Sequence, residues 1–138
     1  MGKEFIKEEK IRFQHCDYAG IVFYPRYFVM LNDLVEDWFA EELGFPFEKM
    51  HPFSGVPTVN INIDFVKPAR LGDRIFKTLA NVEVGGKSLK YQFKFTLDDH
   101  VLLKGHATLV FIHKDQETGQ LKSAPWPEHI KTKLIEWV

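Results

Sequence analysis

The sequence predicts an α+β domain in which an antiparallel sheet wraps around one long central helix. Three observations support this fold class: a single long amphipathic stretch, several strand-like segments after it, and short turns between those segments. The 138 residues suffice for one domain with a real core, so we expect residues 1–138 to form a single domain. A long helix must bury its apolar face, and a sheet of hairpins offers the surface for it.

The first expected element is a strand over residues 5–13, after which the alternating pattern breaks through residues 14–20. The long helix follows. From Tyr27 onward its apolar residues recur at spacings of three and four, while charged residues fill the other face. Pro25 suits the first helical turn, where a missing N–H costs no hydrogen bond, and Gly44 suits the C-terminal stop. The helix therefore has about five turns.

The rest of the chain is predicted to form about four strands and a short terminal helix. The strand-like segments are rich in β-branched and apolar residues, and Gly, Pro or Asp residues bound them. Gly85-Gly86 has the composition of a two-residue hairpin turn. Because short turns join these strands, we expect consecutive hairpins and one sheet face left over for a dimer or tetramer. The expected strands cover residues 56–66, 74–84, 87–97 and 101–113, and the expected helix covers residues 127–138.

Composition narrows the possible partners. The net charge is -1, so nothing favours bulk attraction to nucleic acid, and we expect no nucleic-acid partner. No segment has the roughly 20 apolar residues that a bilayer span needs, so we expect no membrane insertion. Cys16 is the single cysteine, which excludes an intrachain disulfide and fits a cytoplasmic location. The six histidines lack zinc-ligand spacing, so no metal is expected.

Asp17 is the leading candidate for a catalytic residue. It precedes a glycine-containing loop and the expected helix start at about Tyr24. A helix start offers unpaired backbone N–H groups and the positive end of the helix dipole, which together stabilise an oxyanion. A carboxylate beside it can attack a carbonyl or activate a water, and a thioester suits this chemistry because its thiolate leaves readily. On the pattern alone, an N-cap or solvated loop residue is the commoner role for such an Asp.

Two motifs place this chemistry in a known family. Residues 17–27 resemble the signature of the 4-hydroxybenzoyl-CoA thioesterase family of hotdog-fold proteins, which includes the YbgC-like thioesterases. That signature is an Asp, a Gly, two apolar residues, an aromatic pair and a further Tyr. A second family motif resembles residues 63–73, and the likeness extends over about residues 5–113. The resemblance implies a hotdog fold, a homodimer or homotetramer, and hydrolysis of acyl-CoA thioesters without metal or cofactor.

The resemblance also implies roles for single residues. Asp17 is expected to be the nucleophile or general base, and the Tyr24 amide is expected to polarise the carbonyl. The family's CoA-binding hairpin falls on residues 85–88, which makes Lys87 and Ser88 substrate-binding candidates.

Two further substrate-binding candidates come from the residues themselves. Arg70 is basic, and charge-assisted contacts to phosphate are strong. Asn60 lies on a strand beside apolar positions, where it either faces the thioester or lies on the sheet surface. Where the 4-hydroxybenzoyl-CoA enzymes carry a helix Asp near the substrate hydroxyl, this chain has Asn32. The acyl group therefore stays open, with 4-hydroxybenzoyl-CoA as one option.

Three other functions can be weighed against this expectation. An acyl-carrier-protein thioesterase would need a basic surface near the pocket mouth, because carrier proteins are acidic. A non-catalytic acyl-CoA-binding module would not need a carboxylate near the electrophilic carbon, so Asp17 argues against it. A Cys–His hydrolase is disfavoured, because His15 and Cys16 are adjacent on an extended chain and would point to opposite sides.

Overall fold

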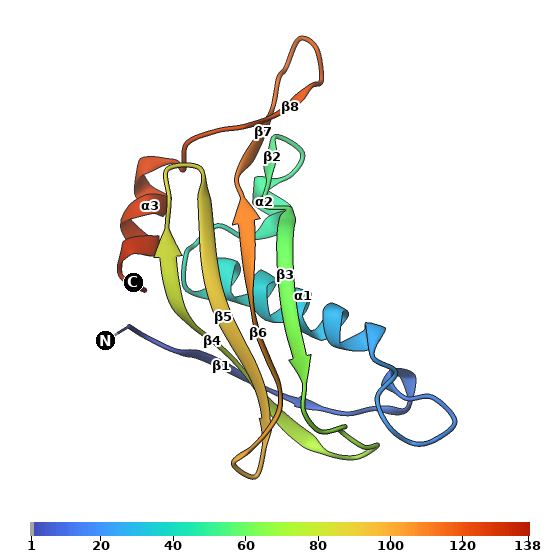
Figure 1. The fold of residues 1–138 in the computed structure, drawn as a ribbon. Helices are drawn as coiled ribbons and strands as arrows, with labels where there is room; N and C mark the ends of the chain where they lie inside the picture. The colour runs from blue at the N-terminus through green and yellow to red at the C-terminus, as the bar shows by residue number, and fades with distance from the viewer. Residues whose placement is uncertain (1) are drawn as a thin grey trace.

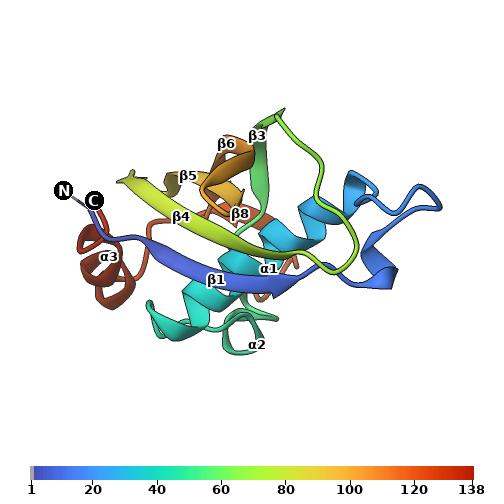
Figure 2. The ribbon, with the colours of Figure 1, turned by 90° about the horizontal axis from the view of Figure 1, so that it is seen from below.

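The protein was analysed as a computed structural model, which describes residues 2–138. A five-stranded antiparallel sheet with the order β1-β4-β5-β6-β3 curves around the long helix α1, and a three-stranded sheet, β2-β7-β8, extends from one end (Figure 1). Figure 2 shows α1 on the concave side of the larger sheet. The predicted α+β class is therefore confirmed. The elements are β1 (Phe5–Lys10), the 3₁₀ turn η1 (Phe13–His15), α1 (Pro25–Glu41), α2 (Phe47–Met50), β2 (Ser54–Gly55), β3 (Thr58–Phe65), β4 (Arg74–Val84), β5 (Ser88–Leu97), β6 (His100–Val110), β7 (Ile112–Lys114), β8 (Leu121–Ser123) and α3 (Glu128–Ile135).

Helix α1 forms where its local signals predict it. Pro25 is its first residue, and Gly44 adopts a φ of 64° just beyond its C-terminal end. The Phe45 N–H then donates to the Phe39 carbonyl at 2.9 Å, which closes the helix end. The apolar stripe faces the sheet, and each large side chain buried there contributes about 1.5–3 kcal/mol. No helix in the described part of the chain is long and apolar enough to cross a membrane.

Several predicted boundaries are wrong where backbone contacts override the local pattern. The first strand ends at Lys10 instead of residue 13, because residues 13–15 turn into η1. The β4–β5 hairpin has three loop residues, 85–87, instead of two, and the Gly85 N–H closes it on the Ser88 carbonyl at 2.8 Å. The last expected strand is divided into β6 and β7. The short elements α2, β2 and β8 were not predicted.

The sheet order is the main departure from the expected consecutive hairpins. β3 pairs with β6, from Asn60 opposite Thr108 to Phe65 opposite Leu103, and it does not pair with β4. Residues 66–73 therefore cross from one edge of the sheet toward the other and pass the start of α1 (Figure 2). In the larger sheet β3 is an edge strand, with one row of backbone groups unpaired within the described chain.

Gly105 lies where β6 passes closest to its neighbours. An added Cβ would lie 1.9 Å from the Asn62 carbonyl oxygen and 2.8 Å from the Phe93 ring. Because the first contact is to backbone, β3 and β6 would have to separate. We expect Gly105→Ala to lower the free energy of unfolding in urea by about 3 kcal/mol. Gly86→Ala is the matched control, since its Cβ would meet nothing within 4 Å. Equal stability of the two variants would contradict the prediction.

Candidate active site

The loop that carries Asp17 comprises residues 15–23 and is called the Asp17 loop below. It folds back on itself as a small hairpin. The Asp17 N–H donates to the Ile21 carbonyl at 3.1 Å, and the Phe23 N–H donates to the His15 carbonyl at 2.9 Å. These bonds hold Asp17 near the chain segment that enters α1.

The Asp17 side chain is exposed and has one intramolecular hydrogen bond. Its Oδ1 accepts the Ala19 N–H at 2.9 Å, and Gly20 completes the turn with a φ of 77°. A residue with a side chain would be strained at that φ, which explains the glycine in the motif. The loop thus orients the carboxylate, while its second oxygen has no hydrogen-bond partner among residues 2–138.

The second sequence motif supports the Asp17 loop from the other side. The Val22 N–H donates to the Ala69 carbonyl and the Leu71 N–H to the Gly20 carbonyl, both at 3.0 Å. The Tyr27 hydroxyl of α1 accepts the Ala69 N–H at 3.1 Å. Two motifs about fifty positions apart therefore form one unit at the start of α1, as the crossing of residues 66–73 requires.

Arg70 belongs to this unit. It forms an isolated antiparallel bridge with Ile21, and its N–H donates to Asp73 Oδ2 at 2.8 Å. The second motif thus forms a turn here, and the exposed Arg70 side chain lies beside the Asp17 loop. Of the predicted substrate-binding residues, Arg70 is the one that a single chain brings to Asp17.

At the start of α1, one backbone donor is left free. Pro25 has no N–H, and the N–H groups of Arg26 and Tyr27 donate to the carbonyls of Phe23 and Tyr24 at 2.8 and 3.1 Å. The Tyr24 N–H donates to no residue in the range 2–138. It therefore lies unpaired at the positive end of the helix dipole, where a developing negative charge is stabilised. A helix start is expected to offer several unpaired N–H groups, and in the structure the Tyr24 N–H is the one that stays unpaired among residues 2–138.

A charged network links the Asp17 loop to the core. His15 Nδ1 accepts the Arg12 N–H at 2.8 Å, so the neutral ring carries its proton on Nε2, which lies 3.6 Å from Glu9 Oε2. The other Glu9 oxygen lies 2.7 Å from Lys77 Nζ, and Lys77, 3% exposed, also donates to the Met30 carbonyl at 3.1 Å. Sequence reasoning missed this network. The sequence feature that could have revealed the network is a pair of charged residues at inward-facing positions of β1 and β4.

Cys16 does not have the environment of a nucleophile. It forms an isolated antiparallel bridge with Val22 within the Asp17 loop, and desolvation, followed by the Asp17 charge, raises the pKa of its thiol. A raised pKa keeps the thiol protonated, which weakens it as a nucleophile. The disfavoured Cys–His pair therefore gains no support. Among residues 2–138, no three His, Cys, Asp or Glu side chains gather as metal ligands would.

A cavity of about 330 Å³ lies between α1 and the sheet. Apolar side chains form most of its lining, among them Phe28 on α1 and Ile61 on β3. Three polar side chains interrupt that lining: Asn32, Thr58 and Tyr91. Phe28 is one helical turn beyond Tyr24, so the cavity begins close to the free N–H.

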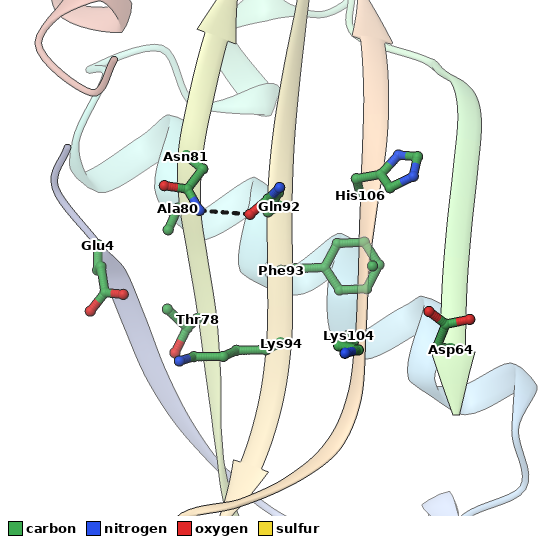
Figure 3. Close-up of a pocket in the computed structure, with 11 residues that line it drawn as sticks. Glu4, Asp64, Thr78, Ala80, Asn81, Gln92, Phe93, Lys94, Lys104 and His106 are labelled. Atoms are coloured by element: carbon green, nitrogen blue, oxygen red, sulfur yellow. Dashed lines mark hydrogen bonds between the residues drawn. The ribbon is translucent and has the colours of Figure 1, made fainter. Parts of the chain in front are cut away.

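A second hollow, of about 390 Å³, lies on the opposite face of the sheet (Figure 3). Its lining is polar, and Asn81 donates a hydrogen bond to Gln92 there at 2.6 Å. None of the predicted site residues lines it, and the sheet separates it from α1. Although it is the larger hollow, it is not part of the candidate site.

Lys87 and Ser88 lie at the β4–β5 hairpin, at the end of the sheet away from the Asp17 loop (Figure 1). Their carbonyls hold the C-terminal region. The Lys87 carbonyl accepts the Phe111 N–H at 2.8 Å, and the Ser88 carbonyl accepts the Trp126 indole N–H at 3.0 Å. A single chain therefore does not bring either residue to Asp17.

Asn60 is also distant from Asp17 within one chain. It alternates along β3 with Ile61, which faces α1, so the exposed Asn60 side chain lies on the outer face of the sheet. Phe65, at the end of β3 near the Asp17 loop, packs against Tyr24 with ring centroids 6.2 Å apart. Asn60 precedes Phe65 by about 16 Å of strand. The single chain thus unites Asp17, Tyr24 and Arg70 only.

Comparisons with known proteins extend this description. A family model described as the thioesterase-like superfamily matches residues 11–134. A 1,4-dihydroxy-2-naphthoyl-CoA hydrolase from Nostoc punctiforme is 20% identical over 135 residues, which cover 97% of this chain and 86% of that protein. The structure of a gentisyl-coenzyme A thioesterase is 25% identical, with a TM-score of 0.81 over 94% of this chain and 98% of that one. An aspartate-to-asparagine variant of 4-hydroxybenzoyl-CoA thioesterase, complexed with 4-hydroxybenzoyl-CoA, is 23% identical, with a TM-score of 0.80 over 94% and 98% of the chains.

Proposed function

The chain belongs to the thioesterase-like superfamily, and on this basis we propose that it hydrolyses acyl-CoA thioesters to a free acid and CoA. The family match and the similar structures confirm the hotdog fold that the two motifs imply. The observation that carries the proposal is the position of Asp17 in a hairpin beside the unpaired Tyr24 N–H. The three relatives are named for acyl groups that are hydroxylated aromatic rings, which supports an aromatic acyl-CoA as the substrate class.

In the proposed mechanism, the Tyr24 N–H polarises the thioester carbonyl and stabilises the oxyanion that develops on it. The Asp17 carboxylate attacks the carbonyl carbon, or it removes a proton from a water that attacks. The C–S bond breaks and CoA leaves as a thiolate, which needs little acid assistance because a thiol pKa is only about 8.5. If Asp17 is the nucleophile, a water then hydrolyses the mixed anhydride and restores the carboxylate.

The substrate-binding roles proposed for Lys87 and Ser88, which would hold CoA, and for Asn60, which would face the thioester, require a second copy of the chain. These residues lie far from Asp17 in one chain, and β3 offers a free edge. If two copies pair antiparallel along β3, the Lys87 end of each chain comes near the Asp17 end of the other. We therefore include a homodimer in the proposal, with a homotetramer as its extension. A cytoplasmic location stays a prediction from the cysteine count.

A thiol-release assay across a panel of thioesters tests the proposed function. The panel contains hydroxylated benzoyl- and naphthoyl-CoA, short aliphatic acyl-CoA and acyl-carrier-protein thioesters. We expect the aromatic CoA thioesters to have the highest kcat/KM. Faster release from carrier-protein thioesters would favour that alternative. Saturable binding without thiol release from any substrate would overturn hydrolysis and favour a binding module.

A further inference from the structure

Tyr91 lies on β5 with its side chain on the helix-facing side of the sheet. In the sheet register it stands opposite Ala107, which in turn stands opposite Ile61. Tyr91 is 2% exposed, and it lines the cavity between α1 and the sheet. The tyrosine is therefore a buried wall of this cavity.

The hydroxyl of Tyr91 has no partner within the chain. No residue from 2 to 138 forms a hydrogen bond with it. The other buried tyrosine, Tyr27, uses its hydroxyl to accept the Ala69 N–H at 3.1 Å. Burial raises the pKa of Tyr91, so its hydroxyl keeps the proton and can donate. Since Tyr91 lines the cavity, its unpaired hydroxyl is able to donate a hydrogen bond to a ligand oxygen there.

The position of the cavity limits the kind of group that would reach this hydroxyl. Asn32, which lines the cavity with Tyr91, lies two turns beyond Tyr24, or about 12 Å along the axis of α1. A two-carbon acyl group held at the Tyr24 N–H does not extend over that length. A flat ring system fits the apolar walls formed by residues such as Phe28 and Ile61, and it carries substituents away from the thioester.

From these contacts we infer that Tyr91 is a specificity-determining residue, whose hydroxyl hydrogen-bonds an oxygen substituent on the ring of an aromatic acyl group. This inference rests on the proposed acyl-CoA hydrolysis and names the chemical class of the acyl group. The apolar lining binds the ring, and the Tyr91 hydroxyl distinguishes an oxygenated ring from its unsubstituted parent. An analogue that lacks the oxygen covers the hydroxyl without offering it an acceptor, which is the basis of the discrimination.

The test compares wild type with Tyr91→Phe, which removes the hydroxyl and keeps the ring. The probes are 4-hydroxybenzoyl-CoA, gentisyl-CoA and 1,4-dihydroxy-2-naphthoyl-CoA, each paired with its unsubstituted parent thioester. We expect the preference, which is kcat/KM for the hydroxylated substrate divided by kcat/KM for its parent, to fall on the order of tenfold in Tyr91→Phe. The parent substrate is the internal control for folding.

Two results would overturn the role of Tyr91: a wild type without preference for any hydroxylated member, or the same preference in Tyr91→Phe. The dissociation constants of the same pairs, measured by calorimetry, separate this role from the proposed function. If wild type releases no thiol, the proposed function fails. The specificity role is still supported in that case if wild type binds the hydroxylated thioester more tightly than its parent and Tyr91→Phe abolishes this preference. Absence of that preference in both turnover and binding contradicts it.

Discussion

Asp17→Asn is expected to lower kcat for hydrolysis of a good acyl-CoA substrate by a factor of about 10²–10⁴, because the amide neither attacks nor accepts a proton in the reaction. The fold is expected to persist. Asp17 is exposed, and the Asn Oδ1 can still accept the Ala19 N–H that Asp17 accepts at 2.9 Å. Thiol release gives kcat, calorimetry gives the dissociation constant of the bound thioester, and thermal unfolding gives Tm. We expect the first to change and the other two to stay close to wild type.

Asp115 provides a matched control for this substitution. It is also an exposed turn residue, and its carboxylate accepts the N–H groups of Glu117 and Thr118 at 2.8 and 3.0 Å. Asp115 precedes β8, at the end of the molecule away from the Asp17 loop (Figure 1). Asp115→Asn should leave kcat unchanged. Undiminished turnover by Asp17→Asn would remove Asp17 from the mechanism. Single-turnover hydrolysis in ¹⁸O-labelled water distinguishes the two possible roles of Asp17, because a nucleophile acquires label and a general base does not.

The second large effect is expected in the free energy of unfolding when Glu9 is replaced by Gln. Lys77 is 3% exposed, and among residues 2–138 Glu9 is the one carboxylate that forms an ion pair with it, at 2.7 Å. Without that carboxylate, the buried ammonium retains the Met30 carbonyl, at 3.1 Å, as its acceptor. Leaving a buried charge uncompensated costs about 3 kcal/mol, which urea unfolding measures. The Glu9→Gln/Lys77→Met double variant should regain most of this loss, because it removes both charges and keeps the volume.

The Lys7–Glu41 pair is the control for burial. Its atoms are as close, at 2.6 Å, but the side chains are 34% and 47% exposed. Exposed pairs contribute about 0–1 kcal/mol, so Glu41→Gln should change stability little. Equal losses in Glu9→Gln and Glu41→Gln would show that burial of Lys77 does not set the cost.

Features set by short-range contacts were predictable from the sequence. Helix α1 begins at Pro25 and ends before Gly44 because the signals for both ends lie within a turn of them. The β4 strand was likewise predicted with its observed bounds, Arg74–Val84. Asp17 and Tyr24 are only seven positions apart, so the loop between strand and helix holds them near each other independently of distant contacts.

Features that depend on distant pairings were not predictable. The residue pattern of β3 is compatible with pairing to β4 as well as to β6. The alternation of apolar and polar residues shows which face of a strand is buried, but it does not specify the neighbouring strand. That choice brings Arg70 to the Asp17 loop and leaves Lys87, Ser88 and Asn60 distant from it. It also places Tyr91 and Ile61 on strands either side of β6, where both line the cavity.

Local residue patterns therefore predicted the fold class and the helix, while the catalytic role expected of Asp17 came from the resemblance of the two motifs to a known family. The tertiary structure shows which amide is unpaired, that Arg70 lies beside the Asp17 loop, and that Tyr91 lines the cavity. Tyr24 is the free donor because Pro25 lacks an N–H and the next two amides are already paired. Such pairing and burial depend on groups that meet only after the chain has folded.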